Sequence, residues 1–171
     1  MSDQFDLVVT ADYPSRTAEF RLCDGHGSQI AYRHTDFKTI DISRQQGLFD
    51  LSNYLRYYVD DGQEAASVAE IGVCIAEEVL GAEIFRKLQE SKAQRTRRIQ
   101  LPCASEEENL LAAALARVPW EIARPAADEP AVGERHLLVR VVHDTAEPKS
   151  TSLKLGPDKS LRVLLVFADR L

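Results

Sequence analysis

The chain has 171 residues, a formal net charge of −6 and a pI near 5.3. Its length fits one domain, or one domain and a piece of another, and its 44% hydrophobic and 28% charged residues are ordinary for a globular protein. The acidic balance argues against nucleic acid as the main partner, and no apolar run approaches the roughly 20 residues of a membrane span.

The cysteines and the first residues predict the compartment. Cys23, Cys74 and Cys103 are odd in number and widely spaced. This usage suits a reducing cytosol better than a disulfide framework. Met1–Asp6 has neither a basic end nor an apolar core, so we expect no signal peptide and a cytoplasmic protein.

Three segments near the N-terminus have the pattern of β-strands. Phe5–Ala11 is rich in β-branched residues, and apolar and polar residues alternate through Ala18–Cys23 and Ile30–Thr35. Turn-forming sequences, Asp12–Ser15 and Asp24–Ser28, separate these segments. We predict an antiparallel meander with one solvent-facing side.

Helical periodicity follows the meander. Leucines at spacings of three and four predict a short helix over residues 48–58, which ends at Asp60–Gly62 because glycine is a natural C-cap. A longer apolar stripe predicts a helical stretch over residues 64–94. Gly72 and Gly81 weaken this stretch, so we expect close packing at these glycines or a break near Gly81 that splits it in two.

The second half of the chain mixes helices, loops and strands. Ile99–Leu101 is a brief strand candidate. Ser105 and Glu108 have the form of a capping box that opens a helix running to Val118, and Pro119 suits the first turn of a further helical segment. Loops are predicted over residues 125–133 and 144–159, and strands over residues 137–142 and 161–168.

The last predicted strand is apolar almost throughout. Such a run is typical of a strand covered on both faces in a parallel α/β sheet, and it normally leads into a crossover helix. The sequence ends three residues after this strand, at Leu171. We interpret the chain as cut after the first strand of an α/β unit, with a terminal strand joining an existing sheet as the alternative. The predicted fold is α+β, with a meander, a helical layer and this opening strand.

The segment Arg117–Ala123 contains the only tryptophan. Its residues Pro119, Trp120 and Glu121 predict a packing anchor rather than chemistry. We expect Trp120 to fill the junction between the helices and the sheet, with its indole N–H hydrogen-bonded. We favour this role over the alternative, a tryptophan that lines a peptide groove.

Several short motifs occur in a fixed order along the chain. They are Ile71-Gly72, Leu80-Gly81, Glu83–Leu88, Val118–Ile122, Leu138–Arg140 and Leu161–Val166. In this order they resemble the N-terminal part of the CHAT domain, a caspase- and separase-like cysteine peptidase fold often fused to tetratricopeptide repeats. The departures are Val118 for a leucine, Ile122-Ala123 for Leu-Leu, and Asp169–Leu171 in place of a small turn.

The resemblance covers most of this chain and about half of the family's domain. It implies that residues 1–158 form a non-catalytic N-terminal portion and that residues 159–171 contribute the first strand of a caspase-like core. The family's catalytic pair is a His in a His-Gly turn and a Cys after a later strand. Both lie beyond the strand with which this chain ends, so no residue here inherits a catalytic role.

This resemblance implies a bracing or regulatory function, and a chain that by itself is not an enzyme. The implied partners are the remainder of a caspase-like domain and a tetratricopeptide-type sensor domain. The alternative is a self-contained binding or scaffold module. In that case the exposed edge of the terminal strand pairs with a partner or with a second copy in a homo-oligomer.

A weaker alternative makes the chain a thiol enzyme. Gly25-His26-Gly27 is similar to the family's catalytic turn, and a nearby cysteine would supply the thiolate. This turn lies in the early meander, however, far from the Pro-Trp-Glu motif. We favour a hairpin turn in which the glycines adopt positive φ, with the cysteines as small apolar fillers.

The remaining polar clusters predict no cofactor and no metal. The four histidines lack paired ligand spacing, His136 and His143 are expected at the surface or at strand ends, and no phosphate-binding glycine motif occurs. Glu106–Glu108 suits the N-terminus of a helix. We interpret the basic residues as a solvated helix end rather than an RNA-binding surface; they are Arg86, Lys87, Lys92, Arg95, Arg97 and Arg98.

Overall fold

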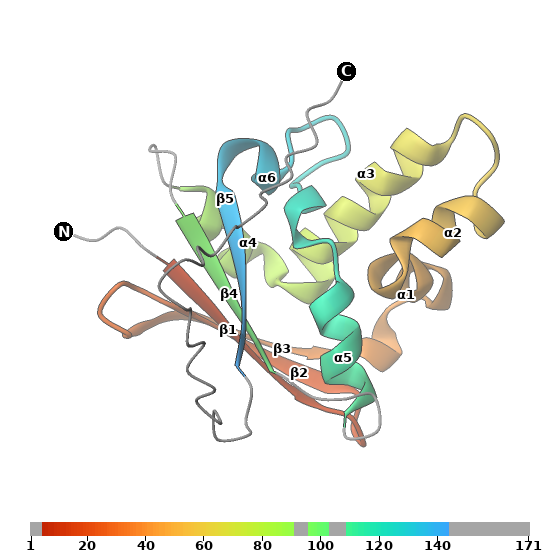
Figure 1. Ribbon diagram of the computed structural model, residues 1–171. Helices are drawn as coiled ribbons and strands as arrows, with labels where there is room; N and C mark the ends of the chain where they lie inside the picture. Colours follow the sequence, from red (N-terminus) through yellow and green to blue (C-terminus); the bar gives the residue numbers. More distant parts are fainter. Residues whose placement is uncertain (1–4, 91–95, 103–108, 144–171) are drawn as a thin grey trace, which may run out of the picture.

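The computed structural model describes residues 5–90, 96–102 and 109–143. Over these ranges the chain has an α+β fold in which helices pack on one side of a mixed β-sheet (Figure 1). The strands are β1 (Phe5–Asp12), β2 (Thr17–Cys23), β3 (Gln29–Asp36), β4 (Thr96–Pro102) and β5 (Leu137–His143). The helices are α1 (Ile42–Phe49), α2 (Leu51–Tyr58), α3 (Glu64–Cys74), α4 (Gly81–Gln89), α5 (Leu110–Arg117) and α6 (Val132–Arg135), with short turns η1 (Phe37–Thr39), η2 (Ile75–Val79) and η3 (Trp120–Ile122).

The described sheet has the strand order β3-β2-β1-β4-β5. β1 pairs antiparallel with β2, and β2 pairs antiparallel with β3, which confirms the predicted meander. β4 then joins the free side of β1 in a parallel register, and β5 joins β4 in the same way. The sheet is therefore half antiparallel and half parallel.

Alternation along the strands gives the sheet two different faces. Alternate residues of β1 and β2, among them Leu7, Val9, Phe20 and Leu22, are buried in the core. The intervening residues lie on the opposite face, because successive side chains of a strand point to opposite sides. In Figure 1 helices α1 to α5 lie on one side of the sheet, so the main core sits between the buried face and these helices.

The predicted helix over residues 48–58 is wrong as a single element. The structure has two helices there, α1 and α2, which meet at Asp50. The backbone of Asp50 is not helical, and its carboxylate accepts a hydrogen bond from the amide of Asn53 at 3.2 Å. An aspartate in this role is a strong N-cap, so α2 begins as a new helix.

The predicted break near Gly81 is confirmed. α3 leads into the π-helical turn η2, and α4 starts at Gly81, whose φ is +76°. Glycine takes this left-handed conformation without steric cost. α4 ends at Gln89, short of the predicted end at residue 94; residues 91–95 lie outside the described ranges.

The other expectation for these glycines, close packing, holds at Gly72. A Cβ atom at Gly72 would lie 2.2 Å from the carbonyl oxygen of Ile122. The Gly72 carbonyl accepts a hydrogen bond of 3.1 Å from the backbone amide of Arg124. The absent side chain at Gly72 thus lets the segment after η3 lie directly against α3.

Three predictions in the second half need correction. The helix that ends at Arg117 begins at Leu110, and its N-cap is Asn109 rather than Ser105. The Asn109 side chain accepts a hydrogen bond from the Ala112 amide at 3.0 Å. Pro119 is the residue before a single 3-10 turn, because its ψ of 70° is not helical. The predicted loop over residues 125–133 ends in α6.

Some predicted elements fall outside the described ranges. The capping-box residues Ser105 and Glu108 are among them. So are the long loop over residues 144–159, the terminal strand over residues 161–168 and the proposed second unit, residues 159–171.

Candidate functional site

The Pro119-Trp120-Glu121 motif lies between the helices and the sheet. Trp120 is 1% exposed, and its ring meets that of Phe20 on β2 edge to face, with centroids 6.0 Å apart and an interplanar angle of 67°. Aromatic pairs favour this geometry. The predicted indole hydrogen bond is not found, since within the described ranges Trp120 Nε1 has no partner.

Backbone hydrogen bonds hold this motif in place. The Ile122 amide donates to the Pro119 carbonyl at 3.1 Å, and the Val132 amide donates to the Ala123 carbonyl at 2.8 Å. The second of these bonds ties η3 to the start of α6. Burial of the tryptophan and fixation of the turn together orient the side chain of Glu121.

Glu121 joins the motif to β5. The Arg140 guanidinium donates from Nη2 to both carboxylate oxygens of Glu121, at 2.6 and 2.9 Å, and from Nη1 to the Ala116 carbonyl at 3.0 Å. Both side chains are partly exposed, so we assign the ion pair only about 0.2–1 kcal/mol of stability. Its role is geometric, because it fixes α5 and η3 against the end strand of the described sheet.

β5 is the first candidate interaction surface. Among the described strands it pairs with β4 alone. Leu138 packs against the core, whereas Leu137 and Val139 are 63% and 38% exposed. The strand expected to offer an edge, residues 161–168, lies outside the described ranges, and β5 is the parallel edge that the structure describes.

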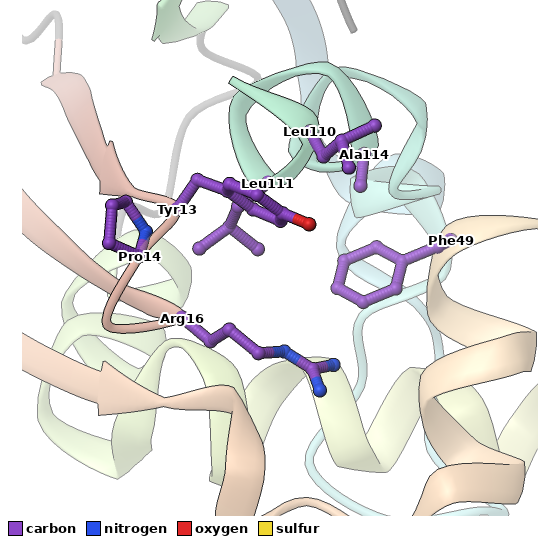
Figure 2. A pocket seen from close by; sticks show the side chains of 7 residues that line it. All are labelled: Tyr13, Pro14, Arg16, Phe49, Leu110, Leu111 and Ala114. Atoms are coloured by element: carbon purple, nitrogen blue, oxygen red, sulfur yellow. The ribbon is translucent and has the colours of Figure 1, made fainter. Parts of the chain in front are cut away.

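A pocket of about 430 Å³ is the second candidate (Figure 2). It lies between the β1–β2 turn, α1 and α5. Figure 2 shows the side chain of Arg16 extending from the turn, beneath Tyr13, toward the ring of Phe49. No local sequence pattern predicts this pocket, because its walls come from three separate parts of the chain. Its lining residues are Tyr13, Pro14, Arg16, Phe49, Leu110, Leu111 and Ala114.

His136 directly precedes β5, as the strand-end alternative predicts, but it is buried rather than at the surface. It is 5% exposed and lines a cavity of about 550 Å³ next to α6, and neither ring nitrogen has a hydrogen-bond partner within the described ranges. Burial lowers the pKa of His136 below 6.5, and the charges of Arg97 and Arg135 act in the same direction. The imidazole is therefore held neutral in the folded chain.

This burial predicts acid sensitivity. With its pKa lowered by folding, His136 binds fewer protons in the folded chain than in the unfolded chain, so stability falls as the pH drops through about 6.5 and on toward the lowered value. We expect His136→Phe to lose less stability than the wild type between about pH 7.5 and pH 5.5, measured by urea unfolding. His26→Asn removes an exposed imidazole as the control. An unchanged pH slope in His136→Phe contradicts this interpretation.

The Gly25-His26-Gly27 segment forms a hairpin turn, as favoured. The Asp24 carboxylate accepts from the amides of Ser28 and His26, both at 2.9 Å, and these bonds lower the pKa of Asp24. Gly27 has φ of +81°. Loop-closing hydrogen bonds and a left-handed glycine account for these residues without chemistry.

Cys74 is not an activated thiol. Burial, followed by the charge of Glu78, raises its pKa to about 12, so the thiolate is scarce at neutral pH. Cys74 is 2% exposed and Cys23 is half-buried. We expect iodoacetamide at about pH 8 to modify Cys74 only after unfolding, as read by peptide mass spectrometry. Labelling of folded Cys74 as fast as Cys23 would overturn this assignment.

The interpretation of the basic residues as a solvated helix end is wrong for Arg97 and Arg98, which lie on β4. Arg97 is 1% exposed. Its guanidinium carbon lies 4.8 Å from the ring centroid of Phe5, and its Nε donates to the Leu88 carbonyl at 3.3 Å. Its neighbour Arg98 pairs with Asp6 at 3.5 Å, and Arg86 pairs with Glu90.

Comparisons with protein-family models, with curated proteins and with solved structures found no match to this chain. Across the described ranges, no helix combines the length and apolarity that crossing a membrane requires. No group of three or more His, Cys, Asp or Glu side chains in those ranges is placed to hold a metal. The fold defines an α+β protein with a mixed sheet, whose described parallel half ends in an edge strand.

Proposed function

We propose that this chain is the non-catalytic N-terminal portion of a CHAT-type, caspase-like cysteine peptidase, and that it braces the catalytic part through β5. The observation that carries the proposal is the parallel edge of β5, beside which Leu137 and Val139 are exposed on the sheet face opposite the core. Parallel sheets are usually covered on both faces, so such an edge is suited to receive a further strand and its helix.

The Pro-Trp-Glu motif supports the same function. In the CHAT family, which this chain resembles, the motif precedes a strand that ends in Val-Arg. Here Glu121 binds Arg140, the arginine of that Val-Arg pair, and Trp120 anchors the motif in the core. A brace must hold its contact strand against its own core, and this ion pair joins the anchored motif to β5.

The proposal extends to compartment and partners. The odd, widely spaced cysteines support a reducing, cytoplasmic location. The resemblance supports an attached tetratricopeptide-type sensor whose state the brace relays to the catalytic part. By itself the chain should not hydrolyse peptides, because the catalytic His and Cys of the family have no counterparts in it.

The coding sequence is the first test of this function. The proposal requires it to continue past Leu171 into a His-Gly turn and a later Cys. The downstream polypeptide, coexpressed with this chain, should then co-purify with it. Leu137→Lys with Val139→Lys should weaken that association about tenfold or more. The matched control is Tyr32→Lys, which changes an exposed aromatic residue on β3 at the other end of the sheet and should leave the association unchanged. A stop codon after Leu171 would overturn the proposal.

A self-contained interaction module is the second candidate. The exposure of Leu137 and Val139 on an edge strand favours it, since such edges invite pairing with another chain. In that case light scattering at several concentrations should detect dimers or larger species, and the double lysine variant should return them to monomers. A wild-type monomer at every concentration would count against self-association.

A further inference from the structure

The pocket of Figure 2 contains a guanidinium group that the fold holds in one orientation. Arg16 Nη2 donates to Gln45 Oε1 at 2.7 Å. The buried amide of Gln45 is itself fixed, because its Nε2 donates to the carbonyls of Phe37 and Ile40, each at 2.7 Å. The Gln45 oxygen therefore faces Arg16, and the guanidinium is positioned before any ligand arrives.

The backbone of Arg16 supports this interpretation. Its φ is 57°, the left-handed region that non-glycine residues rarely occupy. The Arg16 amide donates to the Tyr13 carbonyl, and the Arg16 carbonyl accepts from Phe37, both at 3.0 Å. A strained backbone conformation that is fixed on both sides is a reason to look for function at that residue.

The other walls of the pocket are largely apolar, and no carboxylate of the described residues pairs with the charge of Arg16. Of the seven described residues that line it, Arg16 alone is charged. Within the described residues, the side chain of Arg16 is hydrogen-bonded to one side chain, the neutral Gln45. Arginine binds carboxylates through several hydrogen bonds at once, and Arg16 is exposed, so its guanidinium is open to an incoming carboxylate.

A second pocket continues the surface. It has a volume of about 400 Å³ and shares Phe49 with the first, and Gln45, the partner of Arg16, is among its lining residues. Its other lining residues include the exposed Ile42 and Tyr58, and one acid, Asp50. Among the residues that line the two pockets, Arg16 is the one cation and Asp50 the one acid, and the Asp50 carboxylate already accepts hydrogen bonds from Asn53. The surface therefore fits an extended ligand with a single acidic group beside Arg16.

We propose that this surface, lined by the β1–β2 turn, α1 and α5, binds a segment of a partner protein in which one acidic side chain is flanked by apolar residues. The carboxylate binds the Arg16 guanidinium, and the apolar side chains contact Phe49 and Leu111. No residue of β5 lines either pocket, so the site is separate from the brace surface and is additional to the proposed function.

The test uses the full chain and two short peptides. N-acetyl-Leu-Glu-Leu-amide should shift the NMR signals of Arg16 Nε–H and of the Leu111 methyl groups saturably, with a Kd on the order of 1 mM. N-acetyl-Leu-Gln-Leu-amide lacks only the charge and should bind about tenfold more weakly. Equal binding of the two peptides, or no saturable shift, overturns the proposal.

Two variants of the chain complete the test. Arg16→Gly removes the guanidinium and suits the left-handed backbone, so it should fold and bind the Glu peptide about tenfold more weakly. Arg56→Gln removes one exposed arginine from the neighbouring α2 and should leave binding within about twofold. If Arg56→Gln weakens binding as much as Arg16→Gly, the attraction is non-specific and the proposal fails.

Two other occupants would also overturn the proposal. If the wild type forms a dimer that Arg16→Gly abolishes in light scattering, the occupant is a second copy of this chain. Glu106, Glu107 and Glu108 come shortly before Leu110 in the sequence. If their replacement by glutamine tightens peptide binding about tenfold, the chain's own acidic segment competes for the surface.

Discussion

Replacing Trp120 by alanine is expected to lower the free energy of unfolding by about 3–5 kcal/mol. The indole is 1% exposed and packs edge to face against Phe20, so its removal leaves a cavity at the junction of the helices and the sheet. Urea unfolding followed by far-UV circular dichroism measures the change. Fluorescence is unsuitable, because the mutation removes the only tryptophan.

Trp120→Phe separates packing from hydrogen bonding. Since the indole nitrogen has no partner in the described ranges, its loss should add little, and we expect a cost of about 1–2 kcal/mol from the smaller ring. Tyr57→Ala, at an exposed aromatic residue on α2, should change stability by less than about 0.5 kcal/mol. A stability of Trp120→Ala equal to that of the wild type would show that the motif is not an anchor.

Replacing Gly72 by alanine is expected to destabilise the chain by about 1–3 kcal/mol or more. In an unconstrained helix this substitution stabilises, because alanine is the better helix former. Here the new Cβ would lie 2.2 Å from the Ile122 carbonyl oxygen, which belongs to the backbone after the tryptophan motif. That backbone must move, and the hydrogen bond from Arg124 to Gly72 weakens with it.

Gly47→Ala is the matched control for this substitution. Gly47 is also a buried helical glycine, but the atom nearest to its added Cβ is the terminal methyl group of Ile71, at 2.4 Å. The buried Ile71 side chain can shift within the core, whereas moving a carbonyl oxygen requires the backbone itself to move. We therefore expect a smaller cost, measured by the same urea unfolding. A Gly72→Ala variant as stable as the wild type would mean that α3 and η3 do not pack closely.

Local patterns were sufficient for much of the secondary structure. The alternation in Ala18–Cys23 predicts β2, and the glycine at position 81 predicts the break between α3 and α4. Both signals lie within a few residues of the feature that they predict, since alternation follows from strand geometry and a left-handed turn needs a glycine. The division of residues 48–58 was missed, because the leucine spacing continues across the cap at Asp50.

The candidate sites were less accessible to sequence analysis. The Pro-Trp-Glu motif stood out through its single tryptophan, but its ion pair with Arg140 depends on a residue 19 positions later. The importance of Arg16 was not visible, because nothing in the turn sequence reveals that Gln45, Phe49 and Leu111 surround it. The burial of His136 was missed for the same reason, since the burial of a lone histidine depends on distant elements.

Local patterns were enough to predict the α+β class, the N-terminal meander and the core position of Trp120, because hydrophobic periodicity and turn chemistry act over a few neighbouring residues. Only the folded chain shows that β4 and β5 extend the sheet in parallel, that the backbone of Ile122 packs against Gly72, and that Arg16 lines a largely apolar pocket. These features arise from contacts between residues far apart in the chain. Their geometry is set by how whole elements pack, which no local pattern records.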